Sequence, residues 1–256
     1  MTLELVTIPC LSDNYAFLAH DAATGDTLVV DVPEAAPIVA ELSARGWAAT
    51  HVLLTHHHWD HVDGLADLRA SFPELTVIGA SADAHRLPHL DIAVKEGDAL
   101  QFGGEAGDVY DVSGHTIGHI AVHFADSGLL FTADSLMALG CGRLFEGDGP
   151  MMHQSLSKLA VLPRDTVVCS GHEYTQSNAN FAITVDPENS ALISRIRDIS
   201  DARAKGQPTV PSLLGLELDT NPFLRSHDAA IRAHLGMADA TNAEVFSEIR
   251  RRKDNF

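Results

Sequence analysis

The strongest constraint on this chain is the stretch THHHWDH (55–61), which places four histidines and one aspartate within seven positions. It directly follows HVLL (51–54), an apolar run that is typical of a buried β-strand. Imidazole and carboxylate groups are ligands that Zn, Fe and Mn accept. A tight turn after a strand can direct two of these side chains to one side and the others to another side. The pattern therefore predicts a metal site at a strand end, with ligands for two ions.

Three later segments repeat this arrangement of an apolar run beside a metal-binding residue type. They are VSGHTIGHI (112–120) with His115, LLFTADSL (129–136) with Asp134, and VVCSGHEY (167–174) with His172. A buried carboxylate needs a compensating charge, and an aspartate with one oxygen on each of two cations is compensated fully. The alternatives are a polar loop with incidental histidines at 55–61 and a helix N-cap at Asp134. The recurrence of the pattern favours the metal site.

Other conspicuous residues near these segments have simpler interpretations. His119 could support a ligand or the local structure, and His123 lies within a strand pattern as a packed or surface residue. We expect Trp59 and His57 to point away from the metals and to brace the loop. None of these four residues is a predicted ligand.

The first part of the chain has the pattern of an α/β domain. β-Rich runs occur at 3–8, 27–32, 51–55, 75–80, 120–125, 128–134 and 166–171, with helical patterns near 34–46, 62–72 and 153–162. The strand runs stop at about Tyr174. We therefore expect an α/β domain over residues 1–172 and a helical domain over residues 173–256.

The second part of the chain carries helical spacing. One helix is predicted over 191–206 and another over 226–236, with Ser226 as its N-cap and Gly236 at its end. The connecting stretch 207–223 is rich in Pro, Gly and turn residues, so we expect an ordered excursion between helices.

Charge and composition restrict the partners of the chain. A formal net charge of -18 over 256 residues opposes nucleic-acid binding over most of the surface. No apolar stretch approaches the roughly 20 residues of a membrane span, and the start MTLELVTIPC has no basic signal region. We therefore expect a cytoplasmic protein, monomeric, that binds neither nucleic acid nor membranes. Cys10, Cys141 and Cys169 fit no disulfide framework and are expected to be small buried side chains.

The pattern T-H-x-H-x-D-H-x-x-G at 55–64, followed by the later His, Asp and His, resembles the metallo-β-lactamase superfamily. That resemblance implies an αββα sandwich with metals at one sheet edge. It does not fix the reaction, because the superfamily includes β-lactamases, lactonases, nucleases, persulfide dioxygenases and thioesterases. Further stretches resemble glyoxalase II, the hydroxyacylglutathione hydrolase family, over essentially the whole chain. They are CGRLFEG (141–147), GHEYT (171–175), NANFA (178–182), DPEN (186–189), TNPFLR (220–225) and RRRKDNF (250–256).

This resemblance implies a complete set of ligands. One metal is expected on His56, His58 and His115, and the other on Asp60, His61 and His172. Asp134 and a water or hydroxide are expected to bridge two divalent ions, most simply Zn, with Fe or Mn as alternatives. Asp60 and Asp134 are then the catalytic residues, and Asp60 could also orient the bridging hydroxide.

The resemblance also implies a substrate and its contacts. S-D-lactoylglutathione and related 2-hydroxyacylglutathione thioesters are expected to be hydrolysed, giving D-lactate and glutathione in the second step of methylglyoxal detoxification. The residues that match glutathione contacts of the family are Arg143, Phe145, Tyr174, Arg250 and Lys253. Two of them depart from the commonest pattern, because position 143 is often Lys and position 145 is often Tyr. Phe145 lacks a hydroxyl, so it cannot form the hydrogen bond to glutathione that a Tyr at this position could form.

The basic run Arg250 to Lys253 has two interpretations. Basic residues at the end of a helix complement its dipole, which is the simpler explanation for Arg251 and Arg252. Arg250 and Lys253 are three residues apart and so share one helix face, which lets both reach a single anion. We expect that anion to be the glycine carboxylate of glutathione.

The chemistry of the leaving group favours a thioester. A thiolate leaves without much help from an acid, because a thiol has a pKa near 8.5, whereas a lactam nitrogen must be protonated. The sequence shows no candidate acid beyond the ligands. The main alternative is a mononuclear-iron persulfide dioxygenase, which Asp60 and His172 argue against; another hydrolase of the same fold and a non-catalytic metal-stabilised module are further alternatives.

Overall fold

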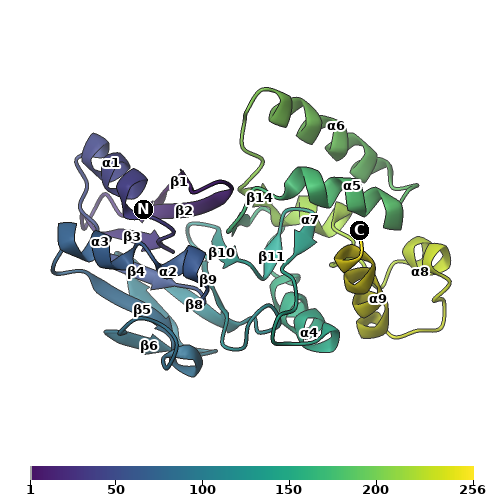
Figure 1. Ribbon diagram of the computed structural model, residues 1–256, viewed down its shortest axis with the longest axis horizontal. Helices are drawn as coiled ribbons and strands as arrows, with labels where there is room; N and C mark the ends of the chain where they lie inside the picture. Colours follow the sequence, from purple (N-terminus) through teal and green to yellow (C-terminus); the bar gives the residue numbers. More distant parts are fainter. Residues whose placement is uncertain (1) are drawn as a thin grey trace. The chain divides into compact units, whose positions relative to one another are not determined.

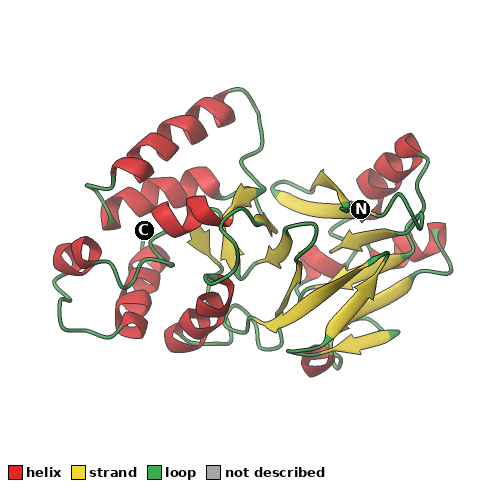
Figure 2. Ribbon diagram, turned by 180° about the vertical axis from the view of Figure 1, so that it is seen from behind, coloured by secondary structure: helices red, strands yellow, loops and turns green. Residues whose placement is uncertain are grey.

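The computed structural model describes residues 2–256, and the chain divides into two compact units (Figures 1 and 2). The first unit runs to Asp111 and includes Ile117–Thr132. The second consists of Val112–Thr116 and Ala133–Phe256. Among the described residues no helix is both long and apolar enough to cross a membrane.

The first sheet lies wholly within the first unit and has the order β1-β2-β3-β4-β5-β6. Its strands are β1 (Glu4–Cys10), β2 (Asn14–His20), β3 (Thr27–Val30), β4 (His51–Leu54), β5 (Thr76–Ala80) and β6 (Ile92–Val94). The pairs β1–β2 and β2–β3 are antiparallel, whereas β3 to β6 run parallel. Because β3 and β4 are parallel neighbours, their carboxyl ends lie at the same edge of the sheet.

The second sheet has the order β14-β13-β10-β9-β8-β7. Its strands are β7 (Ala99–Phe102), β8 (Glu105–Asp111), β9 (Ile120–Phe124), β10 (Leu129–Ala133), β13 (Val167–Ser170) and β14 (Ser212–Leu213). Within the first unit the two sheets face each other. Phe17 of β2 and Phe131 of β10 have ring centroids 6.0 Å apart, and His51 of β4 meets Phe102 of β7 at 5.4 Å. These rings form part of the core between the sheets.

Two helices cover the outer face of the first sheet (Figure 1). They are α1 (Ala35–Arg45) and α3 (Leu65–Ser71), and the short α2 (Trp59–Val62) precedes α3. Ile38 of α1 and Leu68 of α3 are fully buried and belong to the same apolar cluster as Val52 of β4. Helix α1 ends at Gly46, whose left-handed backbone (φ 71°) is the usual way to close a helix.

The second unit is mainly helical (Figure 2). It contains α4 (Gly149–Leu159), α5 (Thr175–Val185), α6 (Ser190–Ala204), α7 (Leu214–Thr220), α8 (Ala229–Leu235) and α9 (Asn242–Asp254), with a small hairpin of β11 (Leu136–Met137) and β12 (Gly140–Cys141). Ala182 of α5 and Leu192 of α6 pack in one apolar cluster. Helix α9 begins with a capping box between Thr241 and Glu244, which satisfies backbone donors of its first turn.

Several local expectations need correction. The predicted N-cap Ser226 is wrong, because α8 begins after Asp228, whose carboxylate accepts from the amides of Ala230 and Ile231. Strand β2 was not expected, since all seven of its residues are buried and it shows no alternation. The stretch 207–223 is ordered, as predicted, and contains β14 and α7. The three cysteines are buried and free, also as predicted.

Candidate metal centre

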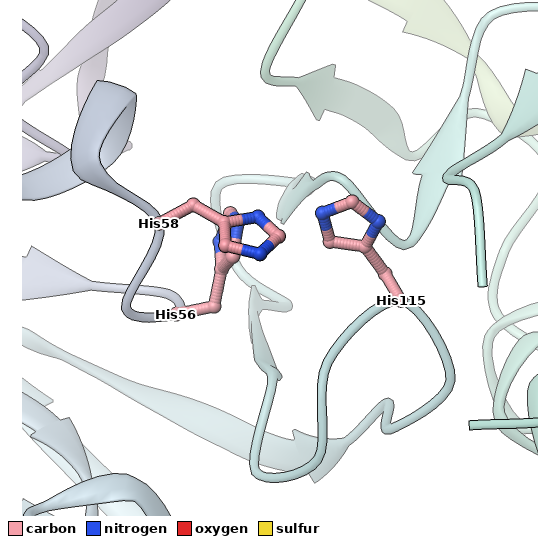
Figure 3. A group of neighbouring side chains, drawn as sticks. All are labelled: His56, His58 and His115. Atoms are coloured by element: carbon pink, nitrogen blue, oxygen red, sulfur yellow. The ribbon is translucent and has the colours of Figure 1, made fainter. Parts of the chain in front are cut away.

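Four of the seven predicted ligands lie at the carboxyl end of β4, in the first unit. His56 and His58 occupy the loop after the strand, and Asp60 and His61 lie in α2. Figure 3 shows the rings of His56 and His58 on this loop, and that of His115 on a separate loop. The Nε2 atom of His56 and the Nδ1 atom of His58 are 3.1 Å apart. Two nitrogens on one tetrahedral zinc are about 3.3 Å apart, given Zn–N bonds of 2.0–2.1 Å, so this pair suits a shared cation.

Asp31 holds this loop from the neighbouring strand end. It follows β3, has a left-handed backbone (φ 57°) and is 2% exposed. Its Oδ1 accepts from the Thr55 amide (2.9 Å), and its Oδ2 accepts from the Thr55 hydroxyl (2.8 Å) and lies 2.8 Å from Nδ1 of His61. A carboxylate can only accept here, so Nδ1 of His61 carries the proton and Nε2 keeps its lone pair.

The same region supports binding of a divalent metal. His56 and His61 are fully buried, and their ring centroids lie 4.2 Å apart. Asp60 is oriented by Asn14, whose amide donates to the Asp60 carboxylate and backbone carbonyl at 3.1 Å each. Oδ2 of Asp60 lies 3.8 Å from Nε2 of His61. Nitrogen and carboxylate donors in this mixture suit Zn, Fe or Mn.

The residues between the ligands have separate surroundings. His57 turns to Asp83, with Nδ1 2.9 Å from Oδ2, and Asp83 is fully buried. Trp59 is 64% exposed, so it does not brace the loop by packing as expected. His119 is fully buried and stacks on His56, with ring centroids 4.5 Å apart. His119 therefore supports a predicted ligand, which was one of its two interpretations.

The other three predicted ligands meet in the second unit. Asp134 follows β10 and is 6% exposed. Its Oδ2 lies 3.4 Å from Nε2 of His115, and its Oδ1 lies 3.4 Å from Nε2 of His172. The two histidines therefore face opposite oxygens of one carboxylate. The resemblance implied that His115 and His172 belong to different ions and that Asp134 lies between these ions; in the structure the carboxylate of Asp134 lies between the two histidines.

The hydrogen bond on the far side of His115 tests whether this group fits cations. Nδ1 of His115 is 2.7 Å from the carbonyl oxygen of Arg143, which can only accept, so Nδ1 carries a proton. In the neutral imidazole the Nε2 lone pair then points toward an anionic oxygen. Two electron-rich atoms at 3.4 Å are stabilised by a cation placed beside both of them. The donor set of this unit therefore fits metal ions.

Gly142 allows the Arg143 carbonyl to reach His115. A Cβ added at Gly142 would lie 2.0 Å from the carbonyl oxygen of Asp134 and 2.8 Å from Nδ1 of His115. Any larger residue would push this loop away from the ligands. Gly142 is thus required because this loop approaches the Asp134 carbonyl and the His115 ring closely.

Two predicted substrate contacts lie directly against histidines of the second unit. The ring of Tyr174 stacks on His172 at 4.6 Å with an interplanar angle of 6°. The ring of Phe145 meets His115 edge-on at 5.4 Å. Tyr174 is 39% and Phe145 62% exposed, so both residues are solvent-accessible next to a predicted ligand.

The predicted contacts of α9 differ in their accessibility. Arg250 is 6% exposed; its Nη1 donates to the Cys141 carbonyl (3.0 Å), and its Nη2 lies 2.8 Å from Asp254. Lys253 is half-buried and donates to the Ser177 carbonyl at 3.2 Å. Burial and the nearby Arg250 lower the pKa of Lys253 to about 8.

Arg143 extends this charged group toward the surface. Its Nε lies 3.6 Å from Asp254, and its side chain is 60% exposed. Asp254 thus lies between Arg143 and Arg250. Arg251 and Arg252 pair instead with Glu248, at 2.7 and 2.8 Å. Both lie in the last turn of α9, the position on which the helix-dipole interpretation of these two residues depends.

Sequence reasoning missed three supporting residues, Asp31, Asn14 and Asp83. For Asp31 a signal was present, because it directly follows the apolar run TLVV, just as Asp134 follows LLFTA. Asn14 and Asp83 carry no comparable signal. They reach the ligand loop only through pairing and packing of strands distant in the sequence.

Comparisons with known proteins cover the whole chain. Residues 15–172 match the model of the metallo-beta-lactamase superfamily, and residues 173–256 match that of the hydroxyacylglutathione hydrolase C-terminus. Proteins named hydroxyacylglutathione hydrolase from Cereibacter sphaeroides and from Ruegeria pomeroyi are each 65% identical over 256 residues, covering all of both chains. The crystal structure of BLEG-1 B3 metallo-beta-lactamase is similar in fold (TM-score 0.67, 20% identity, 86% of this chain and 99% of that one).

Proposed function

Because the chain belongs to the hydroxyacylglutathione hydrolase family of the metallo-β-lactamase superfamily, we propose that it hydrolyses S-D-lactoylglutathione and related 2-hydroxyacylglutathione thioesters. The products are D-lactate and glutathione. The chain is accordingly a thioester hydrolase with an α/β metallo-β-lactamase fold and a helical C-terminal region. We assign catalysis to residues 1–172 and glutathione binding chiefly to residues 173–256.

Two divalent ions, zinc in the simplest case and iron or manganese as alternatives, are part of this proposal. We assign His56, His58 and His115, the side chains of Figure 3, to one ion. Asp60, His61 and His172 are assigned to the other, and Asp134 to both. When bound, the ions supply Lewis acidity, which activates water and polarises a thioester carbonyl at neutral pH.

The observation that carries the proposal is the arrangement around Asp134. Its two oxygens face Nε2 of two different histidines at 3.4 Å each, one oxygen to each histidine. A carboxylate in this position can contact two cations, one with each oxygen. Monodentate ligation of one ion leaves the second oxygen beside an imidazole lone pair, which is unfavourable.

The side chains around the ligands keep the donor atoms oriented before any ion binds. Asp31 fixes the proton of His61 on Nδ1, and Asn14 fixes the Asp60 carboxylate. Preorganisation of this kind reduces the entropy lost when a site forms. In the reaction, a thiolate leaves without a dedicated acid because its conjugate thiol has a pKa near 8.5.

For glutathione we propose contacts with Arg143, Phe145, Tyr174 and Lys253. The rings of Phe145 and Tyr174 are exposed beside His115 and His172, so they can flank the part of the substrate next to the thioester. Arg143 and Lys253 offer the charges for carboxylates. Arg250 is buried, so we assign it an indirect role: it supports the binding surface by contacting the Cys141 carbonyl and the Asp254 carboxylate.

One assay tests the reaction. Purified protein is mixed with S-D-lactoylglutathione under anaerobic conditions, and thiol release is followed with a chromogenic disulfide. We expect thiol and D-lactate in equal amounts, two transition-metal ions per chain by elemental analysis, and loss of activity on chelation. A requirement for oxygen, or a preference for lactams, contradicts the proposed reaction. The proposal also includes a cytoplasmic monomer, which light scattering and cell fractionation test.

A further inference from the structure

Glu173 lies between the proposed ligand His172 and the proposed substrate contact Tyr174, and the proposed reaction gives it no role. Its side chain is 7% exposed. The rings of His172 and Tyr174 stack on each other, so these two side chains lie side by side. The carboxylate of Glu173 is bound by a different part of the chain, 36 residues away in sequence.

That binding partner is Thr209, in the ordered stretch between α6 and β14. Oε2 of Glu173 accepts from the Thr209 amide at 2.8 Å, and Oε1 accepts from the Thr209 hydroxyl at 2.6 Å. Arg203 at the end of α6 adds charge, with Nη1 3.3 Å from Oε2. The same Nη1 donates to the Gln207 carbonyl at 2.9 Å, so Arg203 holds both the carboxylate and the stretch that binds it.

The stretch that carries Thr209 is itself fixed to the sheet. Ser212 of β14 pairs with Val168 of β13, three residues before Gly171, where the GHEY stretch begins. The Leu214 amide donates to the Thr166 carbonyl at 2.9 Å. Val210 is 2% exposed and so is anchored by packing. Glu173 is therefore attached to a stretch that hydrogen bonds and packing hold against β13.

We propose that Glu173 is a positioning residue, which through Thr209 sets the orientation of a metal ligand, His172, and of a substrate contact, Tyr174, at the same time. Rotation of the backbone at 172–174 would move both rings together, because they are stacked. A buried carboxylate bound by an amide, a hydroxyl and a guanidinium resists that rotation, since charge-assisted hydrogen bonds are the strong ones. The inference rests on the proposed roles of His172 and Tyr174.

The test compares metal affinity and kinetics in isosteric variants of the complete enzyme. Glu173→Gln keeps the shape but offers one acceptor oxygen in place of two and loses the charge that faces Arg203. We expect the affinity for the less tightly bound zinc ion to fall by about tenfold, because residues that orient ligands commonly contribute tenfold to a hundredfold to metal affinity. Competition with a chromogenic chelator measures this affinity. With zinc in excess, the KM for the glutathione thioester should rise through Tyr174.

Thr209 supplies a matched pair of variants. Thr209→Val removes the hydroxyl with little change of shape and should weaken zinc binding in the same direction as Glu173→Gln. Thr209→Ser keeps the hydroxyl and should bind zinc as the wild type does. If Glu173 acts through Thr209, the effects of Glu173→Gln and Thr209→Val are less than additive in the double variant.

A control separates positioning from a general loss of stability. Asn189 caps α6 by accepting from the amides of Ala191 and Leu192, far from the ligands in sequence. Asn189→Ala should lower Tm without changing zinc affinity. Unchanged zinc affinity and KM in both Glu173→Gln and Thr209→Val overturn the inference. Because zinc affinity needs no substrate, absence of thioesterase activity in the wild type contradicts the proposed function and leaves this comparison measurable.

Discussion

The two units present their predicted ligands in different ways. In the first unit, side chains hold the ligands: Asp31 orients His61, and Asn14 orients Asp60. In the second unit, the backbone and a neighbouring ring do so, since His115 bonds to a carbonyl and His172 stacks on Tyr174. The proposed substrate contacts all belong to the second unit. Substitutions in the first unit should therefore act on metal binding, whereas those in the second can separate metal binding from substrate binding.

The largest expected effect is at Asp134, where the comparison depends on one carboxylate. Asp134→Asn keeps the shape but turns one side of the group into a donor that faces an imidazole. We expect the metal content to fall below two ions per chain and kcat to fall by more than about a hundredfold. Residues that merely orient ligands already contribute up to a hundredfold to metal affinity or activity. Elemental analysis and steady-state kinetics measure the two effects. Full metal content with near-normal turnover contradicts a bridging Asp134.

Asp31→Asn should have the next largest effect, because it removes the carboxylate that orients His61 in the first unit. If the amide oxygen keeps the Thr55 amide, the amide nitrogen faces Nδ1 of His61 and forces the proton onto Nε2, the nitrogen needed for the metal. We expect zinc affinity to fall by about tenfold to a hundredfold. The control in the second unit is Arg143→Ala. His115 contacts the backbone carbonyl of this residue, and the substitution leaves that carbonyl in place. Zinc affinity should be unchanged there, and an equal loss in both variants contradicts the comparison.

Lys253→Met should affect substrate binding alone. It removes the charge but keeps much of the packing beside Phe181, over whose ring the ammonium lies at 5.3 Å. Contacts with the remote glycine carboxylate stabilise substrate and transition state alike, so KM should rise about tenfold while kcat stays nearly constant. Arg251→Ala is the control, because Arg251 is exposed and pairs with Glu248. A change in kcat with an unchanged KM contradicts a contact between Lys253 and the glycine carboxylate.

The pH dependence of KM checks the same residue. Burial and Arg250 lower the pKa of Lys253 from 10.5 to about 8, so the ammonium is present below that pH and is lost above it. KM for glutathione thioesters should rise as the pH passes 8 in the wild type and stay flatter in Lys253→Met. The same shift disfavours the folded state while Lys253 is protonated, so its penalty to stability is relieved between about pH 8 and 10.5.

The smallest expected effect is a gain in substrate affinity. Phe145 is 62% exposed beside His115, and Phe145→Tyr adds a hydroxyl to this ring. One added hydrogen bond is worth about 0.5–1.5 kcal/mol, so KM should fall by roughly twofold to tenfold. Zinc affinity should not change, because the ring touches the ligand only by its edge. An unchanged KM indicates that the Phe145 ring does not lie against the glutathione backbone.

The sequence by itself determined the chemical class of the site and the α/β character of the first part of the chain. Both depend on local patterns: ligand types such as His56 and Asp134 directly follow apolar runs, and such runs form buried strands. The helical spacing at 191–206 and 226–236 likewise predicted the helices that the structure has as α6 and α8. What the sequence could not determine was which polar residues support the ligands, because those contacts join segments that are far apart in the chain.

Only the tertiary structure decided these contacts. Asp31 reaches His61 because β3 and β4 are parallel neighbours, and Asn14 reaches Asp60 from the first position of β2. Gly142 brings a carbonyl to His115, and Thr209 reaches Glu173 across 36 residues. Arg250 reads in sequence as an accessible cation, yet packing against Phe223 and the Cys141 carbonyl buries it. Side-chain burial and long-range pairing are properties of the folded chain, so no local pattern reports them.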